Sequence, residues 1–235
     1  MNVISLIQKF CRRTGLPVPA SAVGSTDNQI LQVLAILEED VNDLAKRHDW
    51  QGLTHQGSIT TIASEDQGHI DTLSPGFRYL HNNTMWDTTD RLPVIGPRNG
   101  QQWQAMKAIL SNGPRYQFRF LGNHLLVNPV PAAGHVWKFE WSSKNAILDA
   151  DGVTVKEAFS ADTDTFLLPD DLHLLGLRWR WMREKGLDYS ELFNTYEFQV
   201  KDAMGRDGGA PRISLDSNGA VRPGIFVPNG NWTVP

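Results

Sequence analysis

Residues 167–204 read LLPDDLHLLGLRWRWMREKGLDYSELFNTYEFQVKDAM, and this stretch decides the fold that the sequence predicts. Pro169, near its start, suits a first helical turn because the backbone N–H there has no partner in any case. Apolar residues then recur at spacings of three and four along two faces, one of which carries Leu174, Leu177 and Trp181. The pattern predicts a helix that is apolar on two sides.

A second helix is expected after a tight turn. Gly186 suits the left-handed residue at a helix end, and Asp188 with Glu191 three positions later has the spacing of a capping box. A single hairpin partner cannot cover two apolar faces, so the first helix needs a further helical layer or a second copy of the chain. The predicted interface on this helix comprises Leu174, Leu177, Arg178, Arg180 and Trp181.

A second pair of helices is expected at the start of the chain, within residues 1–50. Residues 3–13 are amphipathic and end before a glycine, and residues 30–50 carry a heptad-like apolar seam. Thr26, with Gln29 three positions later, predicts a capping box at the start of the longer helix. The simplest arrangement brings the two amphipathic pairs together as one four-helix bundle, because each pair needs its apolar stripe covered.

The residue pattern changes between the two expected helix pairs, in residues 51–166. Short segments alternate apolar and polar side chains among glycine, proline, asparagine and aspartate, which is typical of strands. Two such segments, 116–121 and 124–128, flank a Gly-Asn pair, a strong hairpin signal. The sequence therefore predicts an α+β fold in which a β-rich insert, 51–166, separates the helix pairs 1–50 and 167–204.

The remaining residues, 205–235, are rich in glycine and proline and show no helical period. They nevertheless carry several large apolar side chains, which disordered tails seldom do. We predict an extended arm that orders by lying on another surface, with a partly degraded flexible terminus as the alternative. The residues of this arm expected to contact a partner are Arg222, Ile225, Phe226 and Trp232.

Composition limits the classes of function. The formal net charge of −4 does not favour gripping nucleic acid by bulk charge. Cys11 is the only cysteine, which excludes an intrachain disulfide and a four-cysteine zinc site within one chain. The N-terminus lacks the pattern of a secretory signal, and no apolar run is long enough to span a bilayer, so a cytosol-like compartment is expected.

Motifs for catalysis or metal binding are also missing from the sequence. The seven histidines form no HxH or HExxH spacing, and there is no GxSxG, P-loop or GxGxxG motif. Asp162 and Asp164 have the spacing of a metal-holding pair, but acids just before a helix are more simply interpreted as capping groups. We therefore expect no enzyme activity, no cofactor and no metal. The alternative is a monomeric glycan-binding or hydrolytic domain that uses tryptophans of the insert, namely Trp86, Trp103, Trp137 and Trp141.

Three segments carry a resemblance to a known family. Residues 159–169 (FSADTDTFLLP), 175–181 (LGLRWRW) and 185–189 (KGLDY) resemble the head-to-tail adaptor proteins of tailed bacteriophages. The nearest likeness is to the adaptor of short-tailed phages, also called a tail tubular or head-completion protein. Residues 122–131 (GNHLLVNPVP) share the resemblance more loosely, as do the first two expected helices in order and length.

The resemblance implies a structural protein of the virion. Such adaptors form a ring, commonly a dodecamer, under the portal protein at the head-tail junction, and are made in the host cytoplasm before assembly. Helices build the ring wall, a β insert faces the tail nozzle or tail fibre proteins, and a C-terminal arm reaches neighbours or the portal. Double-stranded DNA passes through the channel without sequence-specific binding. A ring would multiply the charge of −4 per chain, so DNA in the channel is expected to be weakly repelled.

Overall fold

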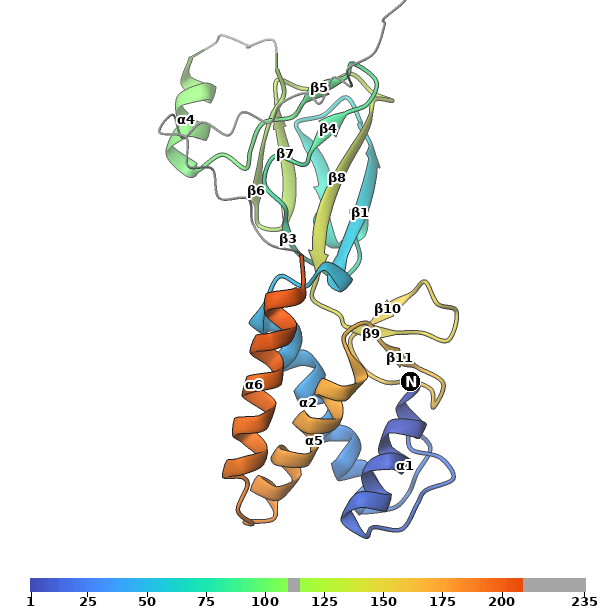
Figure 1. Ribbon diagram of the computed structural model, residues 1–235. Coiled ribbons are helices and arrows are strands. Elements are labelled where there is room, and N and C mark those ends of the chain that lie inside the picture. The colour runs from blue at the N-terminus through green and yellow to red at the C-terminus, as the bar shows by residue number, and fades with distance from the viewer. Residues whose placement is uncertain (110–114, 209–235) are drawn as a thin grey trace, which may run out of the picture.

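The computed structural model describes residues 1–109 and 115–208 and has an α+β fold (Figure 1). The four longer helices gather at one end of the molecule, and most of the strands, with the two shorter helices, form the other end. The helices are α1 (Val3–Thr14), α2 (Asn28–Arg47), α3 (Ile70–Leu73), α4 (Gly100–Ala108), α5 (Asp170–Glu184) and α6 (Ser190–Arg206), with one 3-10 turn at Gln51–Leu53.

The strands form three antiparallel sheets. The largest has the order β1-β8-β4-β5, with β3 also paired to β8, and the others have the orders β2-β7-β6 and β10-β9-β11. Their bounds are β1 (Thr54–Thr60), β2 (Asp66–His69), β3 (Phe77–Leu80), β4 (Trp86–Asp87), β5 (Leu92–Pro93), β6 (Gln117–Leu121), β7 (His124–Asn128), β8 (Val136–Ser143), β9 (Ile147–Leu148), β10 (Val155–Lys156) and β11 (Thr165–Phe166).

Local signals in the sequence identify several elements correctly. The predicted α5–α6 hairpin is present, and the two helices pack against each other. β6 and β7 pair around Gly122 and Asn123, both of which have positive φ, as a tight type I′-like hairpin turn requires. The cap of α2 differs from the prediction, because Asp27 rather than Thr26 accepts the hydrogen bond from the Gln29 backbone N–H.

The predicted four-helix bundle flanking a β insert is wrong. Helices are spread along the chain, since α3 and α4 lie between strands, and no N-terminal pair packs as a unit on a C-terminal pair. α5 is instead the central helix and packs against α2, α6 and α1. α1 is tied to the small sheet, because Asn2 bridges Thr165 and the Val3 N–H bonds the Asp164 carbonyl. Apolar periodicity predicts which face of a helix is covered, but not which element covers it.

Two hydrophobic cores hold the molecule together. The first lies among α1, α2, α5 and α6, and Ala146, Ile147 and Phe159 also belong to it. The second lies between the larger sheets around Trp137 and Phe139. Residues of the expected insert 51–166 therefore contribute to both cores.

Within the described residues, no helix has the length and apolar character needed to cross a membrane.

Candidate functional site

The predicted interface residues of α5 lie inside the chain. Leu174, Leu177 and Trp181 are buried in the helical core, and Trp181 packs edge-to-face on Phe10 of α1 with ring centroids 5.7 Å apart. α1, α2 and α6 thus cover both apolar faces of α5, and these three side chains are not surface groups of the folded chain. Arg178 is half-buried. The other predicted contacts, Arg222, Ile225, Phe226 and Trp232, lie outside the described residues.

A fully buried carboxylate joins three helices. Asp40 of α2 accepts hydrogen bonds from Arg180 Nε at 3.2 Å and from the Tyr196 hydroxyl of α6 at 3.3 Å, and it lies 3.1 Å from His173 Nδ1. Burying a charge is costly unless it is paired and hydrogen-bonded, and Arg180 supplies the opposite charge. Burial, together with the negative charge of Asp40, raises the pKa of Tyr196 well above its usual range, so this phenol stays protonated.

Arg180 extends this network to the surface. Its guanidinium donates to Asp43 at 2.8 Å and to Glu39 at 2.6 Å, and it lies 4.7 Å from the centre of the Trp179 ring. The sequence predicted that Arg180 contacts another subunit. In the structure, Arg180 pairs with three carboxylates of α2 in its own chain. Neither Asp40 nor His173 stands out in the sequence, because the first is one of four acidic residues in the segment 38–43 and the second closely follows two aspartates.

Gly176 allows α2 and α5 to approach each other at this network. A Cβ atom added at this position would lie 1.9 Å from Asp40 Oδ1, far inside van der Waals contact. Only glycine fits at this contact. The signal in the sequence is a glycine in the middle of a helix, which is unfavourable unless another backbone or side chain passes close by.

The pair Asp162 and Asp164 has a structural role. Asp162 Oδ1 accepts the backbone N–H groups of Ala22 and Val23 at 2.9 and 2.8 Å, which fastens the loop after α1. Asp164 is buried and accepts from Lys156 Nζ at 2.8 Å and from two backbone N–H groups of its own turn. These contacts agree with the expectation that Asp162 and Asp164 have a structural rather than a catalytic role. However, the backbone N–H groups that donate to them belong to loops and not to the N-terminus of α5.

The lowered pKa values of Asp162 and Asp164 predict that the chain loses stability in acid. Burial opposes their ionisation, but the N–H and ammonium partners outweigh it and lower the pKa of Asp162 and of Asp164 below the usual 3.8. Protons therefore bind the unfolded chain first, so the free energy of unfolding should fall as the pH drops below 3.8 and approaches the lowered values. Urea titrations at several pH values test this. An Asp164→Asn chain should show a flatter dependence, and an unchanged slope would contradict it.

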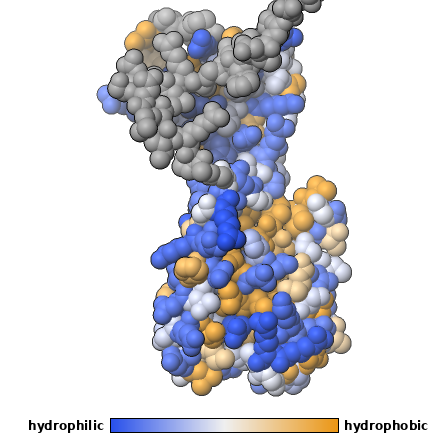
Figure 2. Space-filling view, in the orientation of Figure 1, coloured by the Kyte–Doolittle hydropathy of each residue, from blue (hydrophilic) through white to orange (hydrophobic). Residues whose placement is uncertain are grey.

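One exposed aromatic side chain, that of Phe198, lies on the outer face of α6. Phe198 is 68% exposed, the highest value for an aromatic residue in the described parts of the chain. Its helical neighbours Asn194, Thr195 and Lys201 are exposed and polar, so the ring stands alone on a hydrophilic stripe. Leu187, in the turn before α6, is also exposed. In Figure 2, hydrophobic and hydrophilic residues are interspersed over the visible face of the helical end.

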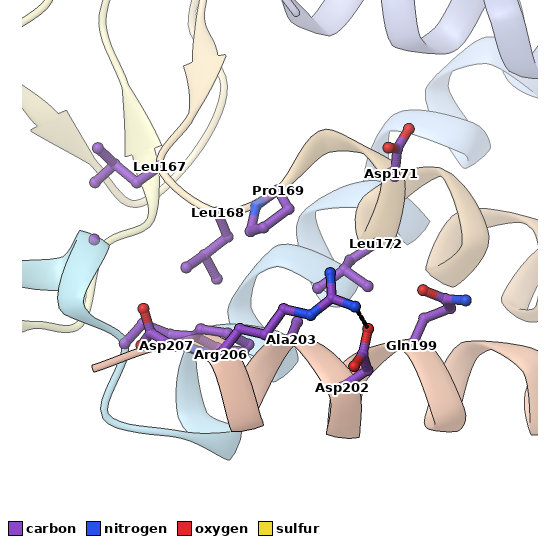
Figure 3. Close-up of a pocket in the computed structure, with 12 residues that line it drawn as sticks. Leu167, Leu168, Pro169, Asp171, Leu172, Gln199, Asp202, Ala203, Arg206 and Asp207 are labelled. Atoms are coloured by element: carbon purple, nitrogen blue, oxygen red, sulfur yellow. Dashed lines mark ion pairs between the residues drawn. The ribbon is translucent and has the colours of Figure 1, made fainter. Parts of the chain in front are cut away.

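A cavity of about 490 Å³ lies where α5 begins and α6 ends (Figure 3). Leu168 and Leu172 contribute apolar surface, while Asp202 and Arg206 of α6 form an ion pair of 2.7 Å at its wall. The carboxylate and guanidinium neutralise each other, and neither has the partners of a general acid or base. The lining also includes Asp171, Gln199 and Asp207, so the wall of the cavity is partly polar.

The tryptophans of the insert provide little surface for a sugar. Trp103, Trp137 and Trp141 are buried, and only Trp86, at 45% exposed, presents a ring to solvent. Stacking on a sugar ring requires an accessible aromatic face. Of the four tryptophans proposed to bind a glycan, only Trp86 therefore has a ring that is accessible to a sugar.

One cluster of potential metal ligands was missed in the sequence. Asp87 of β4, Asp90 and His135 each offer a ligand atom, and these atoms lie within 4.8 Å of one another. Burial opposes the ionisation of Asp87, but hydrogen bonds from His135 and from the backbone of Asp90 lower its pKa. The same hydrogen bond raises the pKa of His135. No local spacing reveals the cluster, because His135 is distant in sequence and arrives through the pairing of β4 with β8.

Comparison of the sequence with models of known protein families gives no match, and a search of curated proteins likewise finds no relative.

Proposed function

We propose that the chain is a non-enzymatic head-to-tail adaptor of a phage virion. In this role it forms a homo-oligomeric ring under the portal protein, connects the capsid to tail proteins and lines the channel for DNA. Segments 159–169, 175–181 and 185–189 support the proposal through their resemblance to such adaptors. The separation of helices and larger sheets to opposite ends also suits a subunit with a wall-forming part and a part that meets the tail.

The observation that carries the proposal is the exposed ring of Phe198. Aromatic residues contribute much of the binding energy when they enter a pocket on a partner, so an exposed aromatic ring suits the role of an interface anchor. A ring requires a heterologous contact, in which one surface of a subunit meets a different surface of the next. Because α5 is covered within the chain, we assign this contact to the outer face of α6 rather than to α5.

Electron microscopy tests the proposed function directly. Full-length protein mixed with the portal protein encoded in the same genome is expected to form a ring stacked on the portal. Long double-stranded DNA added to that assembly is expected to bind weakly at low salt, because a ring of chains with a charge of −4 repels phosphates. A chain that stays monomeric beside the portal would contradict the adaptor role, and tight, salt-sensitive DNA binding would contradict the repulsive channel.

A Phe198→Ser substitution is expected to weaken assembly without unfolding the chain. Loss of an interface anchor costs about 2 kcal/mol or more, which corresponds to about a 30-fold weaker subunit contact. The side chain is mostly exposed, so the midpoint of thermal unfolding should hardly change. Leu121→Ser is the matched control, because Leu121 is also an exposed apolar residue but lies on β6 at the other end. Equal ring yields for both variants, counted by electron microscopy on portal, would refute the assignment to α6.

A further inference from the structure

We propose that Asp87, Asp90 and His135 form a binding site for a divalent transition-metal ion, with Zn²⁺ as the best fit. The site lies at the sheet end of the molecule, where the turn after β4 meets the start of β8. It is independent of the adaptor role, because neither Phe198 nor any contact of α6 takes part in it.

The distances between the ligand atoms suit one ion. His135 Nδ1 lies 2.9 Å from Asp87 Oδ2 and 3.5 Å from Asp90 Oδ2. Zinc binds imidazole nitrogen and carboxylate oxygen at about 2.0–2.2 Å, so two donors on the same ion are about 3.0–3.5 Å apart. These two separations are therefore close to those of a coordinated set, and the third, between the carboxylates of Asp87 and Asp90, is within 4.8 Å.

Hydrogen bonds hold the ligands in place. Asp87 Oδ1 accepts the backbone N–H groups of Thr89 and Asp90 at 2.8 and 3.1 Å, so its other oxygen faces His135. The turn is fastened to β8, because the Thr88 hydroxyl donates to the Val136 carbonyl and the Val136 N–H donates to the Thr89 hydroxyl. Partners of this kind orient metal ligands, and in known sites their loss lowers affinity.

A buried donor lies beside the cluster. Trp137 is fully buried, pairs with Asp87 across β4 and β8, and its indole N–H has no hydrogen-bond partner within the described residues. The indole N–H is nevertheless close enough to Asp87 to help lower the pKa of this carboxyl group, so Asp87 itself is available to it as an acceptor.

The ligand types favour zinc over the common alkaline-earth ions. Mg²⁺ and Ca²⁺ prefer sites made of oxygen alone, whereas an imidazole with two carboxylates suits Zn²⁺. Asp90 is 44% exposed at its side chain, so the site opens to solvent and leaves room for water as a further ligand. Bound there, the ion would fasten the turn of residues 87–90 to the central strand of the largest sheet.

Isothermal titration of the full-length chain with zinc chloride tests the proposal. Wild-type protein is expected to bind one ion per chain saturably, and magnesium chloride is expected to give no comparable heat. Asp90→Asn and His135→Gln should each weaken zinc binding by about tenfold or more. Asp90 is surface-exposed, so Asp90→Asn should keep the far-ultraviolet circular dichroism of the wild type even if His135→Gln does not.

His124→Gln is the matched control. His124 also lies 2.9 Å from a carboxylate, that of Asp66, but no third ligand joins that pair among the described residues. The control should bind zinc as the wild type does. Three results would overturn the proposal: no saturable zinc binding, binding that survives in both Asp90→Asn and His135→Gln, or binding that is lost in His124→Gln. The cluster would then be an ion pair between His135 and its carboxylates only.

Discussion

A Gly176→Ala chain is expected to be less stable than the wild type by about 3 kcal/mol or more in the free energy of unfolding. The added methyl group would lie 1.9 Å from Asp40 Oδ1, so either the two helices must separate or the carboxylate must leave its partners. Separation opens the core around Leu177, and movement of Asp40 leaves the guanidinium of Arg180 without one of its counter-charges. Urea unfolding followed by circular dichroism measures the loss.

Gly205→Ala provides the control for this substitution. Gly205 also lies within a helix, but no atom is within 4 Å of a Cβ added there. Alanine restricts the unfolded chain more than glycine does, so this variant should be more stable by about 0.4–1 kcal/mol. The two substitutions are chemically identical and should act in opposite directions. If both changed stability by the same amount, the close contact between α2 and α5 would not be a determinant of the fold.

Short-range patterns predicted most elements but not their assembly. The Gly122–Asn123 turn and the α5–α6 hairpin follow from residues near in sequence, and both are present. The two apolar faces of α5 were also evident, yet the bundle deduced from them is wrong. Periodicity does not specify which element covers an apolar face. The hydrogen bond from the Val3 N–H to the Asp164 carbonyl, for example, corresponds to no local sequence pattern.

The polar clusters were the least predictable features. Asp40, His173 and Tyr196 belong to three different helices, and each has ordinary neighbours in the sequence. Asp87 and His135 meet only because β4 pairs with β8. Sites assembled from distant segments require the tertiary fold, whereas motifs such as HExxH place their ligands on one helix and can be identified locally.

Asp40→Asn is expected to cost about 3 kcal/mol of the free energy of unfolding, the second large effect. Asparagine keeps the size of the side chain but removes the charge that faces Arg180 in the core. Asp43 and Glu39 still engage the guanidinium from the surface, so the chain should remain folded although less stable. Tyr196→Phe deletes only one long hydrogen bond of the same network and should cost about 1 kcal/mol.

Asp202→Asn separates the effect of burial from the effect of charge. Asp202 pairs with Arg206 at 2.7 Å, but the Arg206 side chain is 79% exposed, and such surface pairs contribute about 0–1 kcal/mol. The same substitution should therefore have a small effect at position 202 and a large one at position 40. Thermal and urea unfolding of the three variants give the ranking directly. If Asp40→Asn were no less stable than Asp202→Asn, the buried carboxylate would not be what holds α2, α5 and α6 together, and apolar packing around Leu177 would have to account for it alone.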